Sequence, residues 1–316
     1  MKILLLNRQE SLWPGGDMVH LRALQGALQQ RGHQVDYSYY ADEYPGDYDV
    51  VHLFHVNFPW CKPMAMQARR YNKPLVVTPI FYADLKLASV AEMRMVTDYA
   101  KAICPMSYDE GVELQDMLGL GVRDKVWTIP AGIPHRWTEP TDAFVPWREP
   151  YVLSVGRAEA LKGHHYVVRA CAELGIPCVV IGEGTKEDVF KSQDDYLQYR
   201  QCFEHIPHLP HEELRRWYQG AKVFALATIS DRMSLVMLEA MSQGCNIAMS
   251  MFNRGNGWFP NLEVFNPFDH QDVVGAIDKA WTAPRGYQDL ARMIPERFTW
   301  DKIAQQYEQV YAHVLS

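Results

Sequence analysis

Each half of this chain begins with an apolar run, a glycine-containing turn and an amphipathic helix. In the first half, residues 2–6 form a continuous apolar run, and Gly15 and Gly16 then open a helix with leucines at helical spacing. In the second half, residues 151–155 meet Gly156, and a helix begins near Gly163. A short apolar run ending in a glycine turn is typical of a strand buried in a parallel sheet. The repeated pattern therefore predicts an α/β fold built from βαβ units.

The chain length and a break in periodicity predict two domains. With 316 residues the chain fits about two domains at the usual ~150 residues each. The apolar periodicity disappears between His135 and Pro150, a segment with three prolines, which is typical of an interdomain linker. We therefore expect domains at residues 1–147 and 148–316.

Composition and charge favour a soluble globular protein and argue against nucleic acid as a partner. The chain is 48% hydrophobic and 22% charged, with a formal net charge of −7. A protein that grips a phosphate backbone is expected to carry a basic excess, which is missing here. The apolar run at the N-terminus is too short for a signal peptide, and no run approaches a membrane span, so we expect a cytoplasmic protein. The six cysteines form no C-x-x-C pair and are expected to be reduced.

Two acidic residues flank the start of a predicted helix in the segment Thr228–Ser250. Asp231 precedes the helix, and Glu239 lies one turn beyond Leu235 on the same side. Carboxylates accept hydrogen bonds from sugar hydroxyls, while the helix N-terminus near Ser234 and Leu235 attracts an anion. The bland alternative is an amphipathic surface helix with two solvated acids, and the segment alone does not decide between them.

Basic residues and glycines recur where other predicted strands end. Arg157 and Lys162 flank one short loop and could converge on a diphosphate; two solvated surface cations are the alternative. Gly182 follows the predicted strand Cys178–Ile181. Gly15 and Gly16 would let backbone N–H groups approach a ligand closely.

Three histidines recur at every third position before the predicted helix 212–219. The spacing of His205, His208 and His211 suggests a metal site, but the prolines between them prevent a helix and no acid or cysteine framework accompanies them. We expect no metal site there. No predicted strand is followed by G-x-G-x-x-G, which argues against a nicotinamide dehydrogenase.

Several of these patterns, in this order, resemble retaining GT-B glycosyltransferases of family four. In the first shared pattern an acid and a glutamate are separated by seven residues, and Asp231 and Glu239 match it. In the second, "VGR" and "KG" are separated by four residues, and Arg157 and Lys162 match it. The third is an early pair of glycines in a turn, matched by Gly15 and Gly16. The sequence departs from the family at Asp231, which replaces glutamate, at Arg232 and Ser234, which replace glycines, and at Ile80, which replaces histidine. The resemblance implies two Rossmann-like domains facing across a cleft, with the last helix (about 299–316) crossing back to the N-terminal domain.

The resemblance also implies an activity. It implies a retaining glycosyltransferase that moves a sugar from a nucleoside diphosphate sugar to a hydroxyl of a glycan, a lipid-linked molecule or a small molecule, with no metal and no cofactor. Glu239 would hold the ribose hydroxyls and Asp231 the donor sugar, while Arg157, Lys162 and the N–H groups near Ser234 and Leu235 would stabilise the diphosphate. Gly15, Gly16 and Gly182 are further donor-side positions.

The acceptor side is less well defined by the sequence. Because Ile80 cannot hydrogen-bond a sugar hydroxyl, His55, Tyr82 or Asp84 would have to substitute for the usual histidine. Together, Ile80 and Asp231 also motivate the alternative of a catalytically impaired nucleotide-sugar-binding or scaffold protein of the same fold. Peripheral membrane contact, the oligomeric state, the nucleotide base and the sugar are left open.

Overall fold

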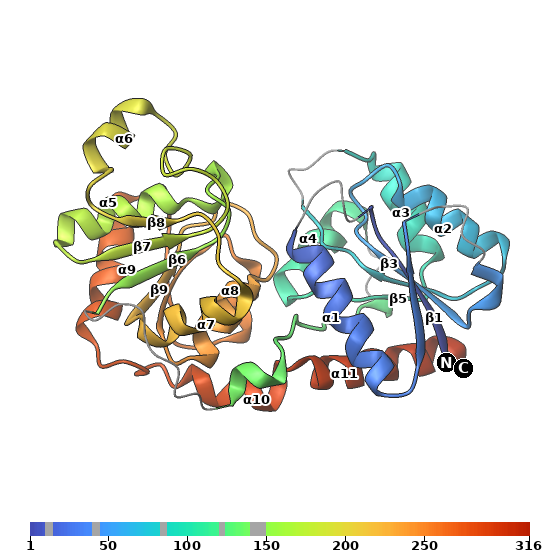
Figure 1. Cartoon of the computed structure of the whole chain (residues 1–316). Coiled ribbons are helices and arrows are strands. Elements are labelled where there is room, and N and C mark those ends of the chain that lie inside the picture. Colours follow the sequence, from blue (N-terminus) through green and yellow to red (C-terminus); the bar gives the residue numbers. More distant parts are fainter. Residues whose placement is uncertain (10–14, 40–44, 83–86, 120–123, 140–149) are drawn as a thin grey trace. The chain divides into compact units, whose positions relative to one another are not determined.

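The computed structural model describes residues 1–9, 15–39, 45–82, 87–119, 124–139 and 150–316, which form two compact units. The first unit combines Met1–Pro134 with Phe298–Ser316, and the second is His135–Arg297. The expected boundary at residues 147/148 lies outside the described residues, and the contacts divide the chain after Pro134. The closing helix belongs to the first unit although it follows the second in sequence (Figure 1).

The first unit is a five-stranded parallel sheet in the order β2-β1-β3-β4-β5, with helices on both faces. Its strands are β1 (Lys2–Leu6), β2 (Gln34–Ser38), β3 (Val50–Phe54), β4 (Leu75–Thr78) and β5 (Ala102–Ile103). Its helices are α1 (Gly16–Gln30), α2 (Cys61–Arg70), α3 (Val90–Tyr99), α4 (Tyr108–Leu118) and α11 (Trp300–Leu315), with a 3₁₀ turn η2 (Pro45–Asp47).

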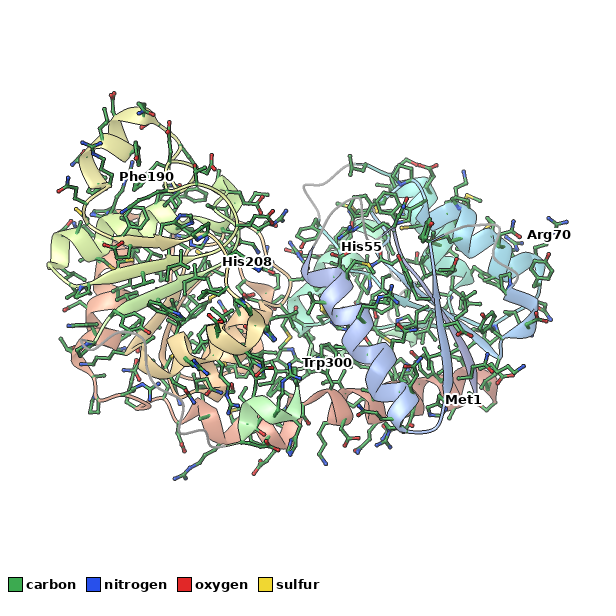
Figure 2. The ribbon with its side chains drawn as sticks, in the orientation of Figure 1. Met1, His55, Arg70, Phe190, His208 and Trp300 are labelled. Atoms are coloured by element: carbon green, nitrogen blue, oxygen red, sulfur yellow. The ribbon has the colours of Figure 1, made fainter. Side chains whose placement is uncertain are left out.

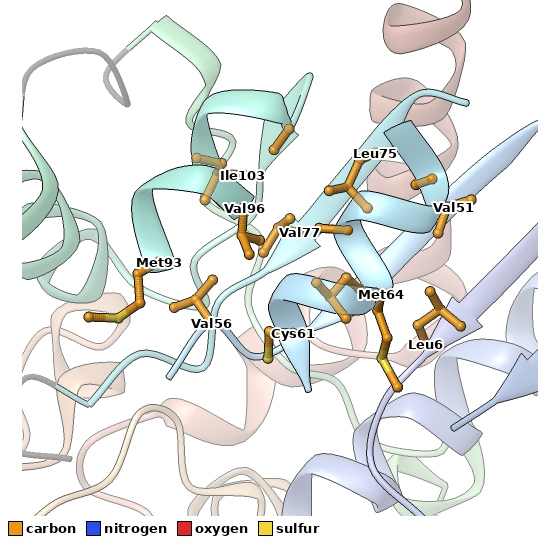
Figure 3. Packing of buried hydrophobic residues seen from close by; sticks show 14 of the residues in the cluster. Leu6, Val51, Val56, Cys61, Met64, Leu75, Val77, Met93, Val96 and Ile103 are labelled. Carbon is orange, nitrogen blue, oxygen red and sulfur yellow. The ribbon is translucent and has the colours of Figure 1, made fainter. Parts of the chain in front are cut away.

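Strand β3 shows how the two faces of this sheet are packed. Val51 and Leu53 join a core with Met64 of α2 and Met93 of α3 (Figure 3). His52 points to the opposite face, where its Nδ1 lies 2.7 Å from the hydroxyl oxygen of Tyr311 in α11. Because alternate residues of a strand face opposite sides, both sets are buried only when helices cover both faces.

The second unit is a six-stranded parallel sheet in the order β11-β10-β9-β6-β7-β8. Its strands are β6 (Val152–Val155), β7 (Cys178–Ile181), β8 (Glu204–Ile206), β9 (Val223–Leu226), β10 (Asn246–Ser250) and β11 (Glu263–Phe265). Its helices are α5 (His164–Leu174), α6 (Gln193–Tyr199), α7 (His211–Gly220), α8 (Leu235–Ser242), α9 (His270–Thr282) and α10 (Met293–Arg297), with 3₁₀ turns η4 (His135–Thr138), η5 (Ala160–Lys162), η6 (Arg254–Trp258) and η7 (Leu290–Arg292).

A second core lies between this sheet and α5 with α9. Val167 and Cys171 of α5 and Val273 and Ile277 of α9 pack on strand residues such as Val180. Each unit therefore buries a core of its own, as expected for a chain of two domains.

The strand order reverses once in each sheet, and this positions the candidate sites. In the first unit the reversal lies between β1 and β3, and in the second between β6 and β9. The loops that follow these strands diverge to opposite faces and leave a crevice at the carboxyl ends, where α/β proteins bind their ligands.

The apolar run at residues 126–129, which lies within the described residues, does not form a strand. Only Val126 pairs, through a single bridge to Ile103. The neighbouring strand β5 is only two residues long, so it has few backbone groups with which residues 126–129 could pair. Among the described residues no helix combines the length and apolarity needed to cross a membrane.

Candidate functional site

Lys162 and Asp231 meet at the point where the second sheet reverses its strand order. Lys162 closes the loop after β6, and Asp231 lies in the loop after the neighbouring strand β9. Lys162 Nζ is 3.0 Å from Asp231 Oδ2, and the two side chains are 25% and 13% exposed. A cation and an anion therefore lie side by side, both partly open to solvent, at the expected edge of the sheet.

The loop between β6 and α5 is held by a buried histidine. His164 Nε2 lies 3.1 Å from the carbonyl oxygen of Gly156 and 3.2 Å from that of Arg157, while its Nδ1 lies 2.8 Å from Ser154 Oγ. Burial lowers the pKa of His164 to about 4, so the ring is neutral at neutral pH. Its Nε2–H then donates to the loop carbonyls and its Nδ1 accepts from the serine, which fixes the backbone that carries Arg157.

Arg157 itself points into solvent beside an acid of the same loop. Its Nη2 is 3.0 Å from Glu159 Oε1, and the two side chains are 44% and 34% exposed. A surface ion pair of this kind contributes little to stability. The guanidinium can therefore change partner at low cost when an anion binds.

Gly182 is required by a close approach of two backbones. Its φ is +158°, and a Cβ at this position would lie 1.8 Å from the carbonyl oxygen of Gly156. Its own carbonyl oxygen accepts a hydrogen bond of 3.1 Å from His205 Nε2. Gly182 therefore lets the loops after β6 and β7 touch, and its predicted contact with a donor stays a prediction.

Two residues of α7 form hydrogen bonds with the Glu239 carboxylate. Its Oε2 accepts a hydrogen bond of 3.0 Å from the hydroxyl of Tyr218, and its Oε1 is 2.8 Å from His211 Nε2. Glu239 is 7% exposed and Tyr218 is fully buried. The hydrogen bond that His211 donates to the Glu239 carboxylate raises the pKa of His211, because it favours the charged imidazolium. Burial raises the pKa of Tyr218 well above its usual value, which keeps its proton in place.

The two acids of the Thr228–Ser250 segment thus have separate partners. Asp231 reaches Lys162, whereas Glu239 reaches Tyr218 and His211. A carboxylate offers about four lone-pair positions, so Glu239 keeps the capacity to accept from a ligand.

The N-terminus of α8 lies between these acids in the sequence. Ser234 is the N-cap, and its side chain makes no capping hydrogen bond. Its backbone N–H donates to Oδ1 of the buried Asn253 at 3.2 Å. The backbone N–H of Met237 donates to the carbonyl oxygen of Ser234 at 3.2 Å. The N–H groups of Leu235 and Val236 precede this first hydrogen bond of the helix and lie at the positive end of its dipole.

In the first unit, an ion pair that is largely buried joins Arg8, after β1, to Asp17 in the first turn of α1. Asp17 accepts hydrogen bonds from Arg8 Nε at 2.9 Å and Nη2 at 2.7 Å, and its Oδ2 is 3.2 Å from His55 Nε2. Burial raises the pKa of Asp17, but hydrogen bonds and charges of His55 and Arg8 outweigh it and hold that pKa well below its usual range. A Cβ on Gly15 would lie 2.6 Å from Asp17 Oδ1, whereas no heavy atom lies within 4 Å of the corresponding position on Gly16. The space beside Gly15 is therefore filled by the protein's own side chains.

The acceptor-side candidates lie at the carboxyl ends of β3 and β4. His55 and Ile80 follow these strands with φ of +75° and +41°, in the left-handed region that side chains other than glycine rarely adopt. The backbone of Tyr82 exchanges two hydrogen bonds with the Asn57 amide, at 2.8 Å and 3.1 Å. Asp84 lies outside the described residues.

Sequence reasoning missed the residues that hold these side chains. These partners are Arg8, Asp17, His164, Tyr218 and Asn253. The spaced histidines drew attention to two of the supporting side chains: His205 hydrogen-bonds the carbonyl oxygen of Gly182, and His211 hydrogen-bonds Glu239. The described residues include no group of three or more His, Cys, Asp or Glu that could hold a metal ion.

Comparisons with known proteins place the second unit in a family. The family model described as glycosyl transferases group 1 matches residues 136–295, which is half of the chain and nearly the whole second unit. The chain belongs to the group 1 glycosyl transferases. It is therefore a glycosyltransferase that takes its sugar from a nucleotide sugar.

Individual relatives extend the similarity to both units. A D-inositol 3-phosphate glycosyltransferase of Xylanimonas cellulosilytica is 25% identical over 309 residues, covering 84% of this chain and 72% of the relative. The protein of the same name from Nocardia farcinica is 24% identical over 237 residues, and the match spans 65% of this chain and about half (51%) of that relative. The solved structure of Anabaena HepE in complex with UDP-glucose superimposes with a TM-score of 0.80 at 13% identity, covering 99% of this chain and 100% of HepE. This structural likeness identifies the GT-B fold.

Proposed function

We propose that this group 1 glycosyltransferase moves a sugar from a nucleoside diphosphate sugar to a hydroxyl acceptor with retention of configuration, and without a metal ion or cofactor. The Lys162–Asp231 pair at the strand-order reversal carries this proposal. At 3.0 Å the two charges neutralise each other, and a donor would offer each a separate partner. Lys162 would turn to the diphosphate, and Asp231 would accept hydrogen bonds from hydroxyls of the donor sugar.

The remaining groups of the site match the other parts of such a donor. Glu239, oriented by Tyr218 and His211, would accept from the two ribose hydroxyls. Arg157 and the first turn of α8 would bind the diphosphate oxygens. Negative charge accumulates on these oxygens as the sugar departs, so cations and aligned N–H groups stabilise the transition state more than the ground state.

The proposed step requires no separate base. The bond between the anomeric carbon and the diphosphate breaks with its electron pair remaining on the diphosphate. The acceptor oxygen forms the new bond on the same face, and its proton passes to the departing diphosphate. Ile80, at the position where the family resemblance leads to an expected histidine, would then leave the proton transfer unaffected.

The relatives suggest which donor to test first. A protein of this fold has been solved with UDP-glucose, and the sequence relatives are named for transfer to D-inositol 3-phosphate. UDP-glucose is therefore the first donor, with GDP-sugars as the next set. The acceptor panel should contain polyols, with and without phosphate, and oligosaccharides.

Titrations with fragments of the donor test the assignment. Arg157→Ala and Lys162→Ala should weaken binding of UDP and of pyrophosphate about 10- to 100-fold, the loss expected for a hydrogen bond to a charged group. Glu239→Ala should weaken UDP and uridine but leave pyrophosphate unchanged. Lys279→Ala is the matched control, since its ion pair with Glu263 is on the surface, with Lys279 67% exposed.

Unchanged dissociation constants in the three site variants would refute the assignment. UDP release from UDP-glucose separates transfer from binding alone. If UDP raises the melting temperature while no nucleotide sugar is hydrolysed or transferred, the protein binds nucleotide sugars without transferring them.

A further inference from the structure

Two loops meet beside the Lys162–Asp231 pair at the carboxyl edge of the second sheet. One follows β9 and includes Asp231 and Ser234, the N-cap of α8, and the other follows β10 and begins at Met251. β9 and β10 are neighbours in the sheet, so their loops leave it side by side. His208, which follows β8, marks the same edge in Figure 2. The loop that carries Asp231 therefore has a neighbouring loop that can support it.

Backbone hydrogen bonds join the two loops at Asp231. Its N–H donates to the carbonyl oxygen of Phe252 at 3.1 Å, and its carbonyl oxygen accepts from the N–H of Arg254 at 3.0 Å. These two bonds form a parallel bridge between Asp231 and Asn253. The position of the Asp231 backbone therefore depends on the loop that follows β10.

The side chain of Asn253 extends this contact to the start of α8. Asn253 is 1% exposed, and its Oδ1 accepts from the backbone N–H of Ser234 at 3.2 Å. Its Nδ2 donates to Oδ1 of Asn256 at 2.7 Å, and Nδ2 of Asn256 donates to the carbonyl oxygen of Ser250 at 2.9 Å. A backbone N–H stands at one end of this chain of amides and a backbone carbonyl at the other. Because each end accepts only one orientation of an amide, both side chains are fixed.

Ser234 differs from the other serine N-caps of the described helices. In those helices ψ of the cap is 151–161° and the cap side chain accepts a hydrogen bond from the first turn; they begin at Ser89, Ser107 and Ser192. The ψ of Ser234 is 113°, and its side chain makes no capping hydrogen bond. Ser234 therefore does not occupy the first N–H groups of α8, although serine is a residue type that usually does so.

We propose that Asn253 is a positioning residue of the donor site. It holds the Asp231 backbone and the N-cap of α8 in the geometry that receives the donor sugar and the diphosphate. Asn253 binds the N–H of Ser234, and the N–H groups that follow Ser234 stay available to the diphosphate oxygens. Negative charge grows on these oxygens in the transition state, so N–H groups held in place beforehand stabilise that state most. The assignment rests on the proposed transferase function and adds to it a residue that does not itself touch the substrate.

Two variants of the amide chain and one matched control test this role. Asn253→Leu keeps a branched side chain and removes both amide groups. Asn256→Ala changes a partly exposed residue, so folding should be retained, and it removes the acceptor that orients Asn253. Asn246→Leu is the control, because Asn246 is a fully buried asparagine at the opposite end of β10. Its amide also hydrogen-bonds backbone groups, but away from the donor site.

Dissociation constants are measured for pyrophosphate, UDP and uridine, and the melting temperature is measured for every variant. We expect Asn253→Leu to weaken pyrophosphate and UDP about tenfold or more, and Asn256→Ala to weaken them about two- to fivefold. Uridine should stay within about twofold of the parent in both, because it would bind through Glu239, whose partners lie on α7. The kcat for release of UDP from UDP-glucose should fall by at least the same factors. Asn246→Leu should lower the melting temperature at least as much as Asn253→Leu and leave the three dissociation constants unchanged.

Three results would overturn the assignment. The first is unchanged pyrophosphate binding in Asn256→Ala, which decides alone if Asn253→Leu does not fold. The second is a loss of uridine binding as large as the loss of pyrophosphate binding. The third is an equal effect of Asn246→Leu and Asn253→Leu on pyrophosphate, because the effect would then follow stability. Each can occur while the parent protein binds UDP and pyrophosphate, whereas absence of binding in the parent would refute the proposed function itself.

Discussion

Replacing Tyr218 with phenylalanine tests whether the Glu239 carboxylate depends on its buried support. The phenol is fully buried and donates a hydrogen bond of 3.0 Å to Glu239 Oε2. Its removal leaves the carboxylate, which is 7% exposed, with His211 as its remaining partner on α7. A hydrogen bond to a charged group contributes about 1.5–3 kcal/mol, so we expect Tyr218→Phe to lower the free energy of unfolding by about that amount.

The free energy of unfolding is measured by urea denaturation, and the melting temperature by thermal denaturation, for the parent protein, Tyr218→Phe and a control variant. For a domain of this size each kcal/mol corresponds to about 2–4 °C, so the melting temperature of the second unit should fall by roughly 3–12 °C. Tyr287→Phe is the matched control, because its hydroxyl also donates to a carboxylate, that of Glu263, but on the surface. That control should cost under about 1 kcal/mol. Equal losses in the two variants would show that burial of the Tyr218–Glu239 pair is not the source of the effect.

Two further substitutions follow from the same unit. The pKa of His211 is raised by Glu239, so their contact contributes full stability below the unfolded pKa of about 6.5 and loses it as pH rises through the folded pKa. His211→Gln should therefore flatten the fall in melting temperature that occurs as the pH rises above about 6.5, and an unchanged profile would contradict this. Gly163 has a φ of +66°, and a Cβ there would lie 2.0 Å from the carbonyl oxygen of Ala227. Gly163→Ala should destabilise by several kcal/mol, more than ~3, whereas Gly275→Ala, with open space around it in α9, should not lower the melting temperature.

Two unbroken apolar runs of the sequence coincide with buried strands. The apolar runs at Leu75–Thr78 and Cys178–Ile181 are strands with those bounds, because a strand buried on both faces needs an unbroken apolar run. The run at residues 126–129 is equally apolar, yet only Val126 pairs. A strand forms only where a neighbouring strand has free backbone groups to pair with, and β5, with two residues, has very few.

The sequence by itself determined which charged groups stand at the ends of which strands. The positions of Lys162 and Asp231 after predicted strands placed them at the carboxyl edge of the sheet, and the resemblance to a family then favoured a ligand site over two solvated surface charges. Which of these groups touch was decided by strand order. β6 and β9 are neighbours in the sheet although the strands β7 and β8 and the helices α5, α6 and α7 separate them in sequence, and this adjacency joins Lys162 to Asp231.

The supporting partners were decided by tertiary structure alone. Tyr218 reaches Glu239 across 21 positions, and Asp17 reaches His55 across 38, so no periodicity of a single helix or strand relates them. The first pairing follows from the packing of α7 against α8, and the second joins the first turn of α1 to the loop that follows β3. Burial makes each pairing obligatory, since a buried carboxylate without partners is too costly to keep. Residue types, spacing and the family resemblance thus predicted a donor site, and packing specified how its acids are held.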